Sequence, residues 1–198
     1  MLDKVMVNNF RQITQFLKFD SEDDFYHLQI LKRKKENPEI GSNSYVIRTY
    51  CIRSKEHLVE KMDEIINLCM HHNARAYINL NRRSFERAAF HTLKKISDII
   101  MNKDYKSVRN AFESVCGEYG SGKDKYWIID IDPEHFELAP TLKLHLTDLE
   151  PIGDKVKTEI PTKNGYHIIT TPFNMAEFKK LYPEVDVHKN NPTILFCN

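Results

Sequence analysis

The sequence has no long hydrophobic run and no marked excess of charge of one sign. No apolar stretch in its 198 residues approaches the length that crosses a bilayer, and the N-terminus lacks a signal-peptide pattern. Lysine and arginine number 29 against 28 acidic residues, which gives a net charge of +1. This balance argues against a protein coated in basic charge for nucleic acid, although screening makes local clusters more informative than the sum. We expect no membrane partner.

Cysteine is also scarce. The four cysteines are scattered without CxxC spacing, at Cys51, Cys69, Cys116 and Cys197. Neither a zinc site nor a disulfide framework is therefore predicted, and we expect a reducing, cytoplasmic compartment. No internal repeat, linker or low-complexity tract divides the chain, whose length is that of one domain with a proper core.

Hydrophobic periodicity predicts strands that alternate with helices. Strands are expected at 25–31, 45–52, 76–80, 126–132, 155–161, 166–170, 185–187 and 193–196. Helices are expected within 1–20 and at 54–71, 84–100, 105–115, 138–149 and 174–181, with Ser54, Ser84 and Asn174 at the starts of three of them. The first two strands are expected to pair, and Asn164-Gly165 is a strong hairpin signal. This pattern favours an α+β domain with a largely antiparallel sheet.

A glycine-rich segment, Gly117 to Lys123, matches the GxxxxGK part of a phosphate-binding loop. Asp124 stands where the Mg²⁺-binding serine or threonine belongs. A P-loop also follows a strand and opens a helix, whereas this segment follows a predicted helix and precedes a predicted strand. We interpret these glycines as a helix cap and turn.

The most informative stretch runs from Asp124 to Pro133, an apolar strand that ends in Asp130 and Asp132. Side chains alternate between the two faces of a strand, so these two carboxylates point the same way. They repel each other unless a cation lies between them, and Mg²⁺ is commonly held by carboxylates together with substrate phosphates. Taken alone, a DxD at a strand end is more often a turn cap or a salt-bridged pair.

Two further polar features follow later in the chain. Lys163 and His167 flank the predicted hairpin turn, and Asp186 with Lys189 accompanies the strand at 185–187. Taken singly, a histidine among apolar neighbours is more often a satisfied, partly buried side chain, and Asp186 would be a loop carboxylate.

Basic residues form two clusters in the first half of the chain. The run 32–35 is interpreted as a solvated face. Arg82 and Arg83 directly follow the strand at 76–80, so they are candidates for a site at a strand end.

In chain order, the acidic and histidine features resemble the motifs of the archaeo-eukaryotic primase superfamily, the primase-polymerases. The first family motif is a strand ending in DxD or DxE, which IIDID at 128–132 resembles. The second is a hairpin with SxH and often a preceding lysine, where Gly165 and His167 take the SxH positions and Lys163 takes the lysine position. The third is a hydrophobic residue followed by aspartate, as in Val185-Asp186. The resemblance covers about residues 124–198.

The resemblance implies one catalytic domain over residues 1–198. Its motif-bearing unit, about 121–198, would be an RRM-like, largely antiparallel sheet with flanking helices, fused to an N-terminal α/β unit of about 1–120, with the active site between them. It further implies nucleotidyl transfer with Mg²⁺ or Mn²⁺, in which Asp130, Asp132 and Asp186 are the catalytic carboxylates and metal ligands.

The implied activity is that of a DNA primase or polymerase, which uses nucleoside triphosphates on a single-stranded DNA template and has a replicative helicase as a further partner. Lys163, Gly165, His167 and Lys189 would bind the triphosphate, with Arg82 and Arg83 as additional candidates for that role. Glycine at position 165 lacks the serine hydroxyl of the motif and leaves its backbone N–H as a phosphate donor.

Two other interpretations remain open at this point. A metal-dependent nuclease of the PD-(D/E)xK type would use Asp130 and either Lys157 or Lys163. That signature requires an acid two residues before the lysine, where this chain has Lys155 and Pro161. A primase-like domain that binds nucleic acid without catalysis is compatible with glycine at position 165.

Overall fold

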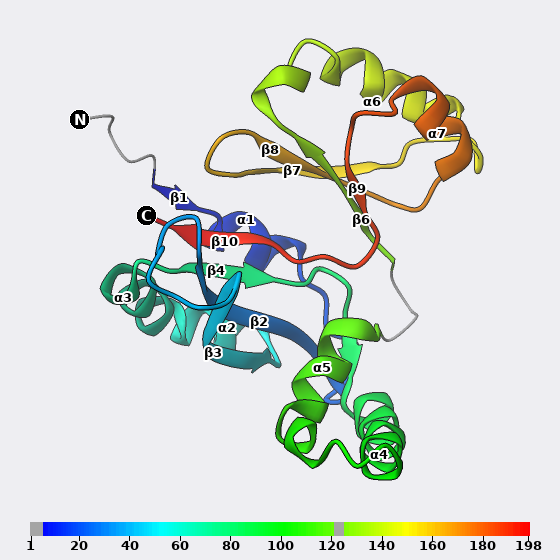
Figure 1. Cartoon of the computed structure of the whole chain (residues 1–198). Coiled ribbons are helices and arrows are strands. Elements are labelled where there is room, and N and C mark those ends of the chain that lie inside the picture. Colours follow the sequence, from blue (N-terminus) through cyan, green and yellow to red (C-terminus); the bar gives the residue numbers. More distant parts are fainter. Residues whose placement is uncertain (1–5, 121–124) are drawn as a thin grey trace.

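The computed structural model describes residues 6–120 and 125–198 and contains two antiparallel sheets (Figure 1). The six-stranded sheet has the order β1-β10-β4-β2-β3, and β5 also pairs with β2; the four-stranded sheet has the order β7-β8-β6-β9. The strands are β1 Val7–Asn8, β2 Asp24–Arg33, β3 Ser44–Ile52, β4 Arg75–Ile78, β5 Arg83–Ser84, β6 Trp127–Ile131, β7 Val156–Pro161, β8 Tyr166–Thr170, β9 Val187–His188 and β10 Thr193–Cys197. The fold is α+β with antiparallel sheets, as expected.

The helices begin largely where the capping residues predict. The α-helices are α1 Phe10–Phe16, α2 Lys55–Glu60, α3 Met62–His72, α4 Phe85–Met101, α5 Ala111–Glu118, α6 Ala139–Asp148 and α7 Met175–Leu181, and the 3₁₀ segments are η1 Tyr105–Asn110 and η2 Pro133–His135. Ser54 accepts a hydrogen bond from the N–H of His57, and Ser84 accepts one from the N–H of Arg87. Asn174 accepts from the N–H groups of the first turn of α7. These side chains satisfy donors that a helix start leaves without intrahelical partners.

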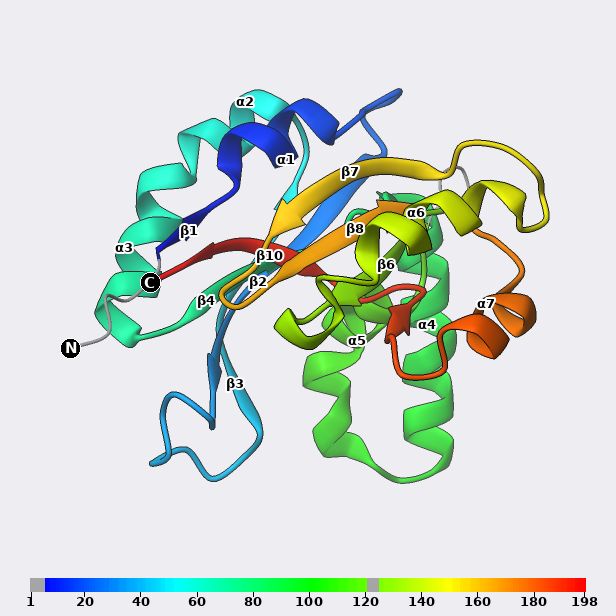
Figure 2. The same cartoon turned by 90° about the horizontal axis from the view of Figure 1, so that it is seen from above.

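Helices cover most of one face of the six-stranded sheet and a smaller part of the other face. Helices α1, α2 and α3 cover the first face, where Leu28 and Ile30 of β2 pack against Ile65 and Cys69 of α3 in the main core (Figure 2). On the opposite face, α4 and α5 cover only one end, around Phe25. The rest of that face is called the open face below.

The four-stranded sheet has the βαββαβ order of a ferredoxin-like or RRM-like unit, as predicted. Strand β6 is followed by α6, the β7–β8 hairpin, α7 and β9. Both helices lie on the same side of the sheet (Figure 1), where Ile129 and Ile131 of β6 pack against Leu142, Leu146 and Phe178. Because side chains alternate, Ile128 and Asp130 face the six-stranded sheet.

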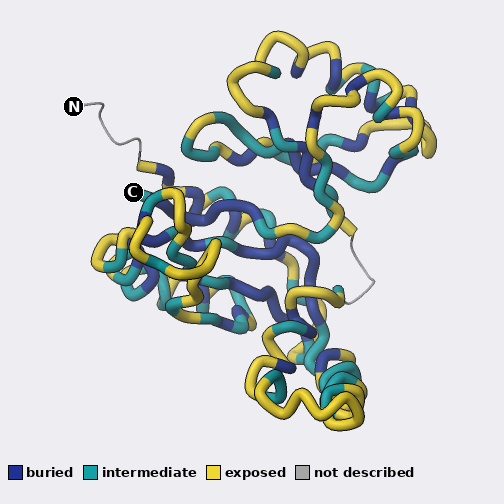
Figure 3. The backbone as a smooth tube through the Cα atoms, in the orientation of Figure 1, coloured by how far each residue is buried: buried dark blue, intermediate teal, exposed yellow. Residues whose placement is uncertain are grey.

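The face of the four-stranded sheet that is turned toward the six-stranded sheet is only partly apolar. Ile128, Ile160 and Ile169 are buried in the main core of the first sheet, so the two sheets share a hydrophobic contact. The buried segments where the sheets meet are dark blue in Figure 3. Asp130 and His167 occupy another part of the face, which lines a cleft between the sheets.

The last strand returns to the first sheet. Strand β10 pairs with both β1 and β4, so Thr193 to Cys197 lies inside the six-stranded sheet. The expected division at about residue 120 therefore does not hold for β10. The β1–β10 pairing also brings the two ends of the described chain close together (Figure 1).

Two expectations from the first part of the sequence can be placed here. All four cysteines are free thiols in the structure. In the P-loop-like segment, Gly117 lies inside α5, and residues 121–124 lie outside the described residues. Within the described chain, none of the helices has the length and hydropathy that a membrane crossing requires.

Candidate active site

The three aspartates of the expected motifs are neighbours at one end of the four-stranded sheet. The backbone N–H of Asp130 donates to the carbonyl oxygen of Asp186 at 2.9 Å, which extends the β6–β9 register by one residue. Directly opposite residues in such a ladder project to the same side, so the Asp130 and Asp186 carboxylates share a face. Asp132 follows β6 in an extended conformation, two residues after Asp130. The side chains of Asp130 and Asp132 line one cavity between the two sheets.

The electrostatics of this cluster are unfavourable for a buried anion. Burial raises the pKa of Asp130, and the neighbouring Asp132 and Asp186 carboxylates raise it further, while His188 and His135 oppose the shift. Among residues 6–120 and 125–198, no group of three or more His, Cys, Asp and Glu side chains has the arrangement of a metal site. The aspartates are therefore adjacent and mutually repelling, and they are not preassembled into a cage.

His167 lies opposite Asp130 on β8. Its Nε2 is 3.5 Å from Asp130 Oδ1, and its Nδ1 forms a 2.8 Å hydrogen bond with the hydroxyl of Thr193 on β10. Burial, followed by the nearby His188, lowers the pKa of His167 to about 4. The imidazole is neutral at pH 7, so its contact with Asp130 is not an ion pair.

Glycine is required at position 165. A Cβ there would overlap the carbonyl oxygen of Ile131 by more than about 1 Å, and would lie 3.3 Å from the Cα of Asp132. The serine of the family motif cannot be accommodated unless the backbone moves. The N–H of Gly165 donates to Thr162 Oγ1 at 3.1 Å, so the donor expected for phosphate is already used within the turn.

The cleft between the sheets consists of two adjoining cavities. The first has a volume of about 390 Å³ and lies between His167 and His188 of the small sheet and Leu31 of β2. The second has a volume of about 270 Å³ and is lined by Asp130, Asp132, Thr162 and Lys163. Arg33, Tyr77, Asp130 and His167 line both cavities.

Cationic side chains of the six-stranded sheet face the aspartates across this cleft. Arg33 at the end of β2, Lys35 just beyond it and Arg75 of β4 line the second cavity. Arg33 also donates to the hydroxyl of Tyr77 at 3.4 Å, and Arg75 is paired with Glu36. The sequence interpretation missed this wall, because the basic run 32–35 was assigned to a solvated face. The available signal was the alternation in β2, which puts Leu31 and Arg33 on one face, beside Arg75 of β4.

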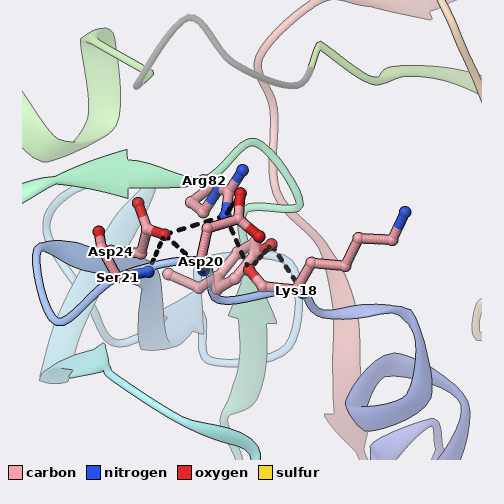
Figure 4. Close-up of polar contacts among 6 residues, drawn as sticks. Lys18, Asp20, Ser21, Asp24 and Arg82 are labelled. Carbon is pink, nitrogen blue, oxygen red and sulfur yellow. Dashed lines mark hydrogen bonds and ion pairs between the residues drawn. The ribbon is translucent and has the colours of Figure 1, made fainter.

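Arg82, expected as a phosphate ligand, is a buried structural residue. Its side chain is 3% exposed and binds Asp24 at 2.9 Å and Asp20 at 2.7 Å. Asp24 in turn accepts hydrogen bonds from the N–H groups of Asp20 and Ser21 (Figure 4). This network holds the turn that precedes β2, away from the cleft.

Arg83 and Lys189 are also engaged outside the cleft. Arg83 is buried, and it donates to the carbonyl oxygens of Cys116 and Asn81 and to the Asn190 side chain. The Lys189 amine lies 5.0 Å from the ring centroid of Trp127, which packs on the helix side of the small sheet. Arg82, Arg83 and Lys189 therefore do not line the cleft, whereas Lys163 and His167 do.

The cleft combines a carboxylate cluster on one wall with guanidinium and ammonium groups on the other. Carboxylates attract divalent cations, and guanidinium groups match phosphate oxygens, so the two walls together suit a metal-bound phosphate ester. No family model, curated protein or solved structure matches the chain. The functional assignment therefore depends on the chemistry of this cleft.

Proposed function

We propose that the protein is a divalent-metal-dependent nucleotidyltransferase that synthesises or extends primers on single-stranded DNA. The observation that carries this proposal is the pairing of two walls across one cavity of about 270 Å³. Asp130 and Asp132 form one wall, and Arg33, Lys35 and Arg75 form the other. Nucleotidyl transfer requires this combination, because the reacting group is a triphosphate that carries its own negative charge.

The donor chemistry fits Mg²⁺ or Mn²⁺. Hard divalent ions prefer carboxylate oxygens, which Asp130, Asp132 and Asp186 supply from neighbouring positions of one sheet. Burial, and then the charges of Asp132 and Asp186, raise the pKa of Asp130, and a bound cation would oppose this shift. When bound, such ions supply activation of the attacking 3′-hydroxyl and stabilisation of the leaving pyrophosphate.

The charge of the triphosphate would be balanced by the opposite wall. His167 is neutral at pH 7, so it contributes a hydrogen bond and no positive charge. Charge compensation then falls to Lys163 of the hairpin turn and to Arg33 of the large sheet, because Arg75 is already paired with Glu36. Thr162, whose hydroxyl accepts from Gly165, lines the same cavity and supplies a hydroxyl beside the turn where the family motif has serine.

The test is incorporation of labelled nucleotides on single-stranded DNA with Mg²⁺ or Mn²⁺. We expect the double variant Asp130→Asn with Asp132→Asn to lose incorporation while keeping its fold, because asparagine preserves shape and removes the charge. The control is Glu60→Gln with Asp98→Asn, which removes the same charge from exposed positions on α2 and α4. Incorporation that survives in the first variant would refute the proposal.

Nucleic-acid binding without catalysis is the second candidate. It is favoured by the absence, within the described residues, of a preassembled group of metal-binding side chains. DNA binding by the wild type with no incorporation under any metal would support this candidate. Degradation of DNA in the absence of nucleotides would instead indicate a nuclease.

A further inference from the structure

A second large depression lies on the open face of the six-stranded sheet, beyond the cleft. It has a volume of about 960 Å³ and is called the groove below. One side is formed by Gln29 of β2 with Val46 and Thr49 of β3, and the other by Lys106 and Arg109 of η1. In Figure 2 the β2–β3 hairpin and the α4–α5 segment project toward the same side of the molecule.

The groove continues into the cleft along β2. Gln29, Leu31 and Arg33 are alternate residues of one strand, so they share the open face. Gln29 lines the groove, while Leu31 and Arg33 line the cleft. A ligand that follows this face therefore passes from η1 to the carboxylates of the small sheet without crossing to another side of the molecule.

The lining of the groove is polar and cationic. Lys106 and Arg109 are both exposed on η1, and Glu113 is the acidic residue beside them. Small-molecule pockets are mostly apolar, so this lining is atypical of such a site. It is typical of a surface that follows a phosphodiester backbone.

One exposed aromatic side chain adjoins the cationic residues of the groove. Tyr105 begins η1, directly before Lys106, and is 64% exposed. An exposed ring beside a cationic channel provides a stacking platform for an unpaired base. Duplex DNA offers no such unstacked base, so the combination favours a single strand.

We infer that the groove binds single-stranded DNA and leads it into the cleft. This inference rests on the proposed function, because it assigns the path of the template to that same active site. Lys106 and Arg109 contact backbone phosphates, and Tyr105 contacts a base. Together with Arg33 in the cleft, these residues define a path across the open face.

The test is binding of a fluorescein-labelled single-stranded oligonucleotide to the full chain, measured by anisotropy in EDTA and without nucleotides. Losing two phosphate contacts on a single strand reduces the slope of log K against log salt by about 1.4, which corresponds to roughly 25-fold weaker binding at 0.1 M salt. We expect this change for Lys106→Gln with Arg109→Gln. The matched control, Lys94→Gln with Lys180→Gln on α4 and α7, should bind like the wild type.

The outcomes separate the groove from the proposed catalysis, because this measurement requires neither metal nor chemistry. Equal binding by the groove variant and the control, or wild-type binding to duplex DNA as tight as to single strands, would overturn the groove assignment. Loss of binding in Tyr105→Ala would support it. A wild type that binds DNA through the groove but incorporates no nucleotide would overturn the proposed function and leave the groove assignment standing.

Discussion

Replacing Gly165 with alanine places a methyl group between the backbones of β6 and β8. All three nearest atoms to the added Cβ belong to the backbone: the carbonyl oxygen of Ile131, its carbonyl carbon at 3.0 Å, and the Cα of Asp132 at 3.3 Å. No flexible side chain can move aside. Relief therefore requires the two strands to separate by about 1 Å at the end that carries Asp130.

The cost can be estimated from these contacts. Forced insertion of one methyl group into packed structure costs about 1–3 kcal/mol, and loss of one ladder hydrogen bond between β6 and β8 adds about 1 kcal/mol. The reduced entropy of the unfolded chain returns less than about 1 kcal/mol. We expect Gly165→Ala to lower the free energy of unfolding by about 3 kcal/mol, which lowers Tm by roughly 6–12 °C for a chain of this size.

Chemical denaturation and calorimetry of Gly165→Ala measure this directly. Gly41→Ala is the matched control, because a Cβ at Gly41 meets no atom within 4 Å. We expect the control to unfold within about 0.5 kcal/mol of the wild type. Gly165→Ser should destabilise as much as alanine, even though it recreates the motif serine. A free energy of unfolding for Gly165→Ala close to that of the control would refute the steric argument.

Four further outcomes are expected. Arg82→Met should cost about 3–5 kcal/mol in urea denaturation, because it leaves the 1%-exposed Asp24 carboxylate without its cation, and adding Asp24→Asn should recover part of the loss. Gly117→Ala should stabilise by about 0.5–1 kcal/mol in the same measurement, since its Cβ meets open space within α5. Burial, and then the charge of Arg83, lower the pKa of His27 to about 4. The neutral imidazole therefore makes its full contribution to the free energy of unfolding above pH 6.5, and this free energy falls by up to about 3 kcal/mol as the pH drops toward 4. His27→Gln should remove that part of the pH dependence, measured by denaturation between pH 4 and 7. Mn²⁺ at 100 times its Kd should stabilise the wild type by about 2.7 kcal/mol in thermal unfolding, and Asp130→Asn should lose that stabilisation.

The local elements were predictable because their signals are local. Ser54, Ser84 and Asn174 cap helices as their positions indicate, and the Asn-Gly turn joins β7 and β8. The partner of β10 was not predictable in the same way. Its five residues are buried, and a continuously buried strand carries no mark of which sheet it joins.

The residues of the candidate site were also predictable only where the signal is local in the sequence. The aspartates and His167 were found because their spacing along the chain carries the pattern, and β6, β8 and β9 bring them together. Arg33 and Arg75 were missed because their proximity depends on the register of β2 with β4, in which Leu31 pairs with Arg75. Arg82 was misassigned because an arginine after a strand gives no indication of a buried acid, here Asp24, that lies 58 residues earlier in the chain.

The geometry of the cleft depends on residues that do not line it. Its acidic wall belongs to one sheet and most of its basic wall to the other, so the distance between the opposite charges is set by how the chain crosses between the sheets. Asn81 contacts the chain at both crossings. Its side-chain amide donates to the carbonyl oxygen of Tyr126 and accepts from the N–H of Tyr126, and it also donates to the carbonyl oxygen of Lys189. Asn190 donates to two carbonyl oxygens at the end of α5 and accepts from Arg83. Arg83 therefore acts on the cleft through the placement of the sheets, because its guanidinium is committed to these contacts and does not reach the basic wall of the cleft.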